Sequence, residues 1–236
     1  MSFWEKLLNA VADTASNALS AMVEAIRTVF EGDPETRRQV AFSVAVIALS
    51  AKMAKADGIV SEAEVEAFRH IFDFPDDQAK NVAKLYNLAR QDVAGYDAYA
   101  SRLAGLCKTC AADCPVLEDV VDGLFHIAKA DGLIHEKEMD FLAHVAEIFG
   151  IGEERFQTIT ARHVYVEGRD PYEVLGVSPS DDFASIRKHY RVLVSQHHPD
   201  RLIARGVPEE FHAIANDRMA TMNAAYEAIE KERRAA

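Results

Sequence analysis

The sequence is poor in cysteine, glycine and proline, with 3, 11 and 7 of them in 236 residues. An odd number of cysteines, all between positions 107 and 114, does not fit the disulfide framework of a small secreted protein. So few glycines and prolines argue against collagen-like and low-complexity chains, and against a β-sandwich with many turns. These absences favour a soluble, helical protein of the cytoplasm.

Long apolar runs are missing as well. The longest extends from Val40 to Ala51 and is interrupted by Ser43 and Ser50. A helix that spans a membrane needs about 20 apolar residues, so this run predicts a buried core helix. Charged residues near the start of the chain leave no long apolar segment for a signal peptide.

Residues 1–32 are expected to form an amphipathic helix, because their apolar side chains recur at steps of three and four. We interpret this stripe as a surface that packs on the chain's own domain or on a second copy in a homodimer. The alternative is attachment of residues 1–30 to the inner face of the membrane. A membrane-surface helix prefers several basic residues on its polar face, and Lys6 and Arg27 are nearly alone there.

Basic residues are in deficit, which gives a net charge of −12. Residues 169–236 hold 10 Lys and Arg against 11 Asp and Glu, whereas residues 1–168 hold 16 against 27. A broad basic surface for duplex nucleic acid is therefore excluded, and we expect no nucleic-acid partner. The uneven charge indicates two units with different partners.

The acidic part of the chain contains an internal repeat. Residues 54–64 and 128–138 match at an offset of 74 positions, and both segments lie between apolar runs with helical periodicity. This pattern predicts a duplicated helical unit. In the first copy, Gly58 would end one helix and Ser61 with Glu64 would form a capping box for the next; the second copy has His135 at the capping position.

Carboxylates at equivalent places in the two copies raise an alternative interpretation. They could converge on a divalent cation through oxygen ligands, although their spacing is not that of an EF-hand loop. The four candidate ligands are Asp57, Glu64, Asp131 and Glu138. The duplicated turns, over about residues 35–160, resemble the TerB family, which implies a helical bundle whose acidic residues are proposed to bind metal.

Three cysteines, Cys107, Cys110 and Cys114, have the spacing of one helical face. A zinc site needs four ligands and no second pair completes one. We interpret the cysteines as small apolar side chains of the core, with a redox or metal site as the alternative.

The segment from residue 170 onward has a different pattern of helix-capping and helix-ending residues. A short helix opens at Asp170-Pro171 and ends at Gly176, and Asp181 or Asp182 would cap a longer helix over about residues 183–196. Proline restricts the residue before it to extended conformations, so this helix must end at or before His198. A loop over residues 202–207 and a last helix from Pro208 would complete a helical hairpin with a polar tip.

The residues of this segment closely resemble a J domain, the module of Hsp40 co-chaperones. The match covers residues 170–230 and includes D-P-Y-x-V-L-G-V and the sequence H-P-D-R at the tip. The resemblance implies that the tip stimulates ATP hydrolysis by a DnaK-type Hsp70 and that a basic helix face docks on that partner. Val192 departs from the family, where a second consecutive basic residue is frequent. The implied Hsp70-binding residues are His198, Pro199, Asp200, Arg187, Lys188, Tyr190, Arg191 and Arg201.

A TerB-like domain followed by a J domain resembles the DjlA family of bacterial J proteins. We therefore predict an all-α fold with a duplicated helical bundle over residues 33–162, a linker over 163–169 and a J-domain hairpin over 170–236. The predicted function is that of an Hsp70 co-chaperone with an unknown client, no required cofactor and no catalytic residues of its own. The alternative is a metal-binding or stress-response protein with an accessory J domain.

Overall fold

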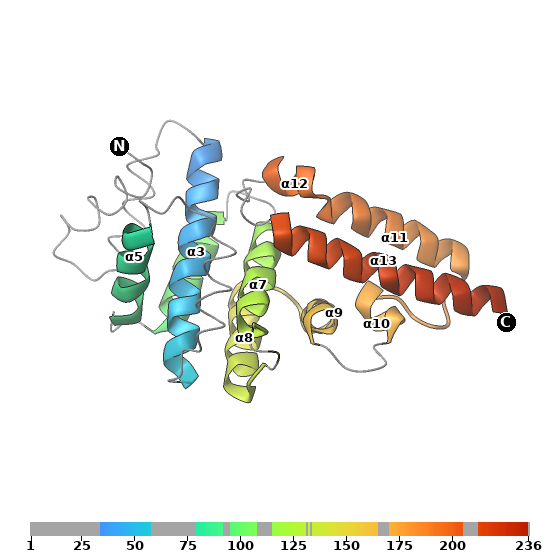
Figure 1. The fold of residues 1–236 in the computed structure, drawn as a ribbon, viewed down its shortest axis with the longest axis horizontal. Helices are drawn as coiled ribbons and strands as arrows, with labels where there is room; N and C mark the ends of the chain where they lie inside the picture. The colour runs from blue at the N-terminus through green and yellow to red at the C-terminus, as the bar shows by residue number, and fades with distance from the viewer. Residues whose placement is uncertain are drawn as a thin grey trace.

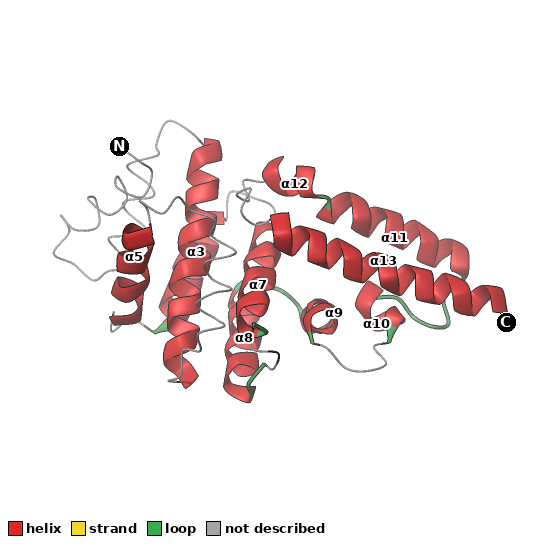
Figure 2. Ribbon diagram, viewed as in Figure 1, coloured by secondary structure: helices red, strands yellow, loops and turns green. Residues whose placement is uncertain are grey.

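The computed structural model describes residues 34–57, 79–91, 95–107, 115–130, 132, 134–164, 170–204 and 212–235. This part of the chain is built of helices joined by turns and contains no strand (Figure 2). The predicted all-α fold is confirmed. Within the same ranges, every helix is too short or too polar to cross a membrane. The amphipathic segment 1–32, together with Gly58, Ser61 and Pro208, lies outside the described residues.

The first domain is a helical bundle arranged around one central helix. Helix α3 packs against α5, α6, α7 and α8, and in Figure 1 it stands upright in the middle of the bundle. Every side chain from Phe42 to Ala54 is buried, as expected for a helix that is apolar on all sides. The predicted core helix is thus confirmed. The helices of this domain are α3 (Pro34–Asp57), α5 (Ala79–Gln91), α6 (Tyr96–Cys107), α7 (Pro115–Ala128), α8 (Glu136–Ile148) and α9 (Glu153–His163).

The second copy of the repeat forms the turn between α7 and α8. Gly132 has φ +93° and its N–H donates to the carbonyl of Lys129 at 2.9 Å, a left-handed conformation that glycine adopts at low cost. Glu138 reaches back and accepts a hydrogen bond from the backbone N–H of His135 at 2.8 Å. The glutamate half of a capping box therefore forms even with histidine at the capping position.

The second domain begins with α10 (Pro171–Leu175) and α11 (Phe183–His197), and local chemistry sets their ends. The Asp170 side chain accepts from the N–H of Tyr172, and Asp182 accepts from the N–H of Ser185, both at 2.9 Å. Gly176, with φ +67°, ends α10. These helix boundaries agree with the sequence-based predictions.

The hairpin is completed by α12 (Pro199–Ala204) and α13 (His212–Ala235). Helices α11 and α13 lie side by side along the hairpin (Figure 1). The predicted loop over residues 202–207 is wrong in its first part, because residues 202–204 continue α12. The hairpin has its own buried core, formed by Tyr172, Val174, Leu175, Ile186, Leu193, Met222, Ala225 and Ile229.

The two domains pack directly on each other. Helix α10 contacts α9, and the first part of α13 contacts α7 and α9 (Figure 1). Helix α9 extends to His163, the first residue of the segment expected to act as a linker. Three apolar residues of the hairpin tip, Leu202, Ile214 and Ala215, belong to the core of the first domain rather than to that of the hairpin.

Candidate functional site: an exposed polar loop beside a basic helix face

The loop between α11 and α12 is shaped by Pro199. His198 is extended, with φ −62° and ψ 136°, because the proline ring disfavours a helical residue before it. Pro199 then starts α12, where a first helical residue needs no N–H. The His198 carbonyl accepts hydrogen bonds from the N–H groups of Arg201 at 2.9 Å and Leu202 at 3.2 Å. The predicted end of the long helix before His198 is confirmed.

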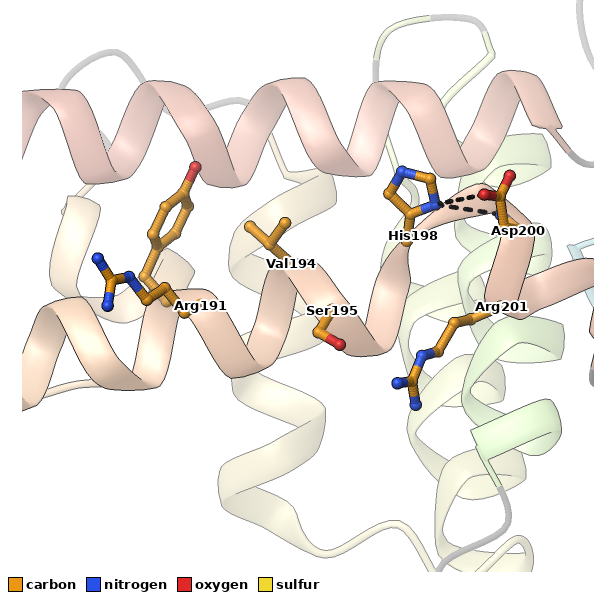
Figure 3. A pocket seen from close by; sticks show the side chains of 7 residues that line it. Arg191, Val194, Ser195, His198, Asp200 and Arg201 are labelled. Atoms are coloured by element: carbon orange, nitrogen blue, oxygen red, sulfur yellow. Dashed lines mark hydrogen bonds and ion pairs between the residues drawn. The ribbon is translucent and has the colours of Figure 1, made fainter.

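His198 and Asp200 face each other across this loop. The backbone N–H of Asp200 donates to His198 Nδ1 at 3.3 Å, and Asp200 Oδ2 lies 3.6 Å from the same nitrogen. The two side chains are 52% and 86% exposed. Figure 3 shows them next to each other at the end of α11. An accepting Nδ1 leaves the proton of a neutral imidazole on Nε2.

A basic face continues from the loop along α11. Arg187, Lys188 and Arg191 on α11 and Arg201 on α12 are all exposed, and none forms an ion pair with another described residue. Val192, which is 46% exposed, lies among them. The face can therefore attract an acidic surface without first breaking a salt bridge to another described residue.

A shallow groove of about 480 Å³ connects this face with the loop. In Figure 3, Arg191 extends from α11 and Arg201 extends from α12, beyond His198. Such a groove, open to solvent and bordered by cations, suits a protein segment better than a small molecule. It is lined by Tyr190, Arg191, Val194, Ser195, His198, Asp200 and Arg201.

Tyr190, the remaining predicted contact residue, also holds the hairpin together. Its hydroxyl donates to Asn223 Oδ1 at 2.8 Å, and its ring stacks on Tyr226 with centroids 4.1 Å apart. Both partners lie on α13. Tyr190 thus fixes the spacing of α11 and α13 while its edge contributes to the groove.

The predicted metal ligands fall mostly outside the described part of the chain. This holds for Glu64, Asp131 and the side chain of Asp57, which ends α3. Glu138 is buried and already accepts the hydrogen bond from His135. Among the residues that the structure describes, no three His, Cys, Asp or Glu side chains gather as a metal site. The side chains of Cys107, Cys110 and Cys114 also lie outside the description.

A group of charged side chains buried between the domains was missed by the sequence-based interpretation. Asp119 and Asp122 on α7 contact Arg218 on α13, and all three are at most 5% exposed. Three acidic residues, Glu118, Asp119 and Asp122, interrupt the apolar run 116–127. They are the signal that points to such a site, because charges are rarely buried without a partner.

Two family models match the chain, one on each domain. Residues 43–161 match TerB, the tellurite resistance protein, and residues 170–236 match the DnaJ domain. The TerB match covers half of the chain. No solved structure matches.

Curated relatives are similar over either the second domain or most of the chain. Co-chaperone protein DjlA of Photorhabdus laumondii is 45% identical over 64 residues, which are 27% of this chain and 23% of that protein. The proteins of the same name from Photobacterium profundum and Coxiella burnetii are each 29% identical, covering 83% and 77% of this chain and 79% and 73% of their own lengths. The chain therefore belongs to the TerB family, carries a DnaJ domain after its TerB domain, and is similar over most of its length to proteins named co-chaperone protein DjlA.

Proposed function

We propose that this chain is an Hsp70 co-chaperone that acts through its DnaJ domain. The observation that carries the proposal is the exposed loop of His198 and Asp200 at the end of α11, continuous with a basic face that has no partner among the described residues. A polar tip held in a fixed conformation by Pro199, beside exposed cations, is built to dock on an acidic protein surface. The relatives named co-chaperone protein DjlA support the same function.

The chain works on the partner's reaction rather than on a reaction of its own. The groove offers a histidine and an aspartate but no nucleophile held by a base. Docking that is stronger to the hydrolysis-competent arrangement of an ATP-loaded Hsp70 shifts the population of that arrangement. The rate of ATP hydrolysis then rises through this differential affinity.

The TerB domain directs the co-chaperone to its place of action. A domain that binds a client or a surface raises the effective concentration of the DnaJ domain there. A membrane surface, the alternative to protein packing for the amphipathic stripe of residues 1–30, is one such place, and flotation of the full chain with anionic vesicles tests it. Recovery of the chain only in the bottom fraction would contradict membrane attachment.

Substitution His198→Gln tests the co-chaperone function. We expect loss of stimulation of a DnaK-type Hsp70 in single-turnover ATP hydrolysis, with unchanged helicity by circular dichroism, because the side chain is 52% exposed and supports no core contact. The matched control is His144→Gln on α8, also an exposed histidine, which should stimulate like wild type. A His198→Gln protein with wild-type stimulation would refute the function.

The alternative, a metal-binding protein with an accessory DnaJ domain, rests on the acidic residues repeated at an offset of 74 positions. Oxygen ligands of this kind favour a hard divalent cation. Calorimetric titration with calcium distinguishes the two functions, since the co-chaperone mechanism requires no heat of cation binding.

A further inference from the structure

The two domains are joined by a buried ionic contact. Arg218 on α13 donates from Nη1 to Asp119 Oδ1 on α7 at 3.0 Å, and also to Asp122 Oδ2. The three side chains are 2–4% exposed. A buried charge is costly unless it is paired, so a movement of α13 away from α7 would be costly because it separates Arg218 from both carboxylates. This contact holds the first part of α13 in one place.

Asp122 is fixed from the opposite side by the first domain. His163 Nε2 lies 2.7 Å from Asp122 Oδ1, and the His163 ring stacks on Phe125 with centroids 5.0 Å apart. Burial lowers the pKa of His163, so its neutral ring donates from Nε2. Burial would raise the pKa of Asp122, but Arg218 and His163 outweigh it and hold that pKa well below its usual range. Asp122 is therefore an anion whose second oxygen is aimed at Arg218.

The exposed loop is anchored on the first domain at both of its ends. Immediately before the loop, His197 is 3% exposed and its Nε2 lies 3.5 Å from Arg155 Nη2 on α9. Arg155 is itself held by Glu118 on α7 through two hydrogen bonds of 2.8 and 2.9 Å. Immediately after the loop, Leu202 is 2% exposed and belongs to the core of the first domain.

A backbone hydrogen bond connects the buried Leu202 to the exposed loop. The N–H of Leu202 donates to the carbonyl of His198, and α12, which holds Leu202, packs against α13, the helix that carries Arg218. A displacement of α13 from α7 would thus move Leu202 and, with it, the backbone of the loop. Residues 198–201 are exposed or half-buried, whereas His197 before them and Leu202 after them are buried.

We propose that Arg218, held by Asp119 and Asp122, is a positioning residue for the loop of His198 and Asp200, so that the TerB domain is a working part of the Hsp70-stimulating unit. This inference rests on the proposed co-chaperone function. If the TerB domain only targeted the DnaJ domain, the contact would affect stability or localisation but not the stimulation reached with saturating co-chaperone. If Arg218 positions the loop, its loss lowers the stimulation at saturation.

The test measures single-turnover ATP hydrolysis by a DnaK-type Hsp70 against increasing concentrations of the full chain. For Arg218→Met, we expect maximal stimulation to fall about tenfold if the loop keeps its docked arrangement one tenth of the time. Arg218→Lys, which keeps the positive charge, should retain part of the maximal stimulation that Arg218→Met loses. Lys129→Ala is the matched control: it breaks an ion pair of 2.9 Å to Asp217 across the same interface, but one exposed to solvent, and should keep wild-type stimulation.

Hydrogen exchange of the same proteins reports on the loop directly. Arg218→Met should speed exchange in the peptide that contains the N–H groups of Arg201 and Leu202, while peptides from the middle of α11 keep their protection. The proposal would be overturned if Arg218→Met reached the maximal stimulation of wild type, with or without a rise in its half-maximal concentration. It would also be overturned if Arg218→Lys lost as much maximal stimulation as Arg218→Met. If Arg218→Met does not fold, Leu202→Ala is judged by the same two measurements. A wild type that does not stimulate Hsp70 at all would refute the proposed function itself.

Discussion

Mild acid should destabilise the fold through His197. Burial, together with Arg218 and Arg162, lowers the pKa of His197 to about 2, against 6.5 in an unfolded chain. Asp122 acts in the opposite direction but is outweighed. The folded protein therefore keeps this ring neutral at pH 5, whereas the unfolded chain binds a proton there. The free energy of unfolding therefore has its full value from this group above pH 6.5 and decreases as the pH falls below that value.

The size of the effect follows from the shift in pKa. Each unit of pH below 6.5 costs about 1.4 kcal/mol for one such group, so His197 alone removes about 2 kcal/mol of unfolding free energy between pH 7 and pH 5. His126, with its pKa lowered to about 4 by burial and Lys129, acts in the same direction. The lowered pKa of Asp122 contributes nothing in this window, because its unfolded value of 3.8 lies below it.

Urea unfolding at pH 7 and pH 5, followed by circular dichroism, measures this loss. His197→Gln removes the titrating group. Between pH 7 and pH 5, the unfolding free energy of this variant should therefore fall by about 2 kcal/mol less than the unfolding free energy of wild type falls. The adjacent His198, whose side chain is 52% exposed, provides the matched control: His198→Gln should retain the full loss. Equal losses in wild type and His197→Gln would refute the assignment of a buried neutral imidazole.

Further predictions concern the domain contact, the basic face and the acidic repeat. Gly176→Ala should lower the free energy of unfolding by about 1–2 kcal/mol or more, because its φ is +67° and an added Cβ would lie 3.1 Å from a side-chain oxygen of α9. Gly150→Ala is the control: its φ is +77°, but the space around it is open, so its loss in the same urea assay should be smaller. Val192→Lys should lower the half-maximal concentration for Hsp70 stimulation, and 0.3 M salt should abolish that gain, since the added charge is exposed; a gain that persists would contradict electrostatic docking. Calcium should release heat with wild type but not with the double variant Asp57→Asn, Asp131→Asn if the acidic repeat binds a cation, and no heat with either would exclude calcium binding.

The parts of the fold that the sequence predicts are those set by neighbouring residues. The short helix α10 begins at Asp170-Pro171 and ends at Gly176, because a capping carboxylate and a left-handed glycine act within one turn of the chain. The end of α11 before Pro199 has an equally local cause. The exposed loop and basic face could therefore be located from sequence.

The domain interface could not be predicted in this way. Arg218 is 96 residues from Asp122 and 99 from Asp119 along the chain, and helical periodicity contains no information on contacts at that distance. For the same reason, residues 202–204 were expected in a loop. Leu202 is buried by the first domain, and packing of this kind across an interface stabilises a short helix that its own sequence does not specify.

Part of the acidity of the first domain is explained by the contacts at this interface. Glu118, Asp119 and Asp122 bind two arginines, one on α9 and one on the DnaJ domain, so part of the negative charge stabilises the contact between the domains. A fragment cut at residue 170 would expose Leu202 and Arg218, which in the full chain are 2% and 4% exposed. The sequence boundary at residue 170 separates two family matches, but it divides a single packed unit. Physical coupling across that boundary is what allows the TerB domain to influence how the loop meets Hsp70.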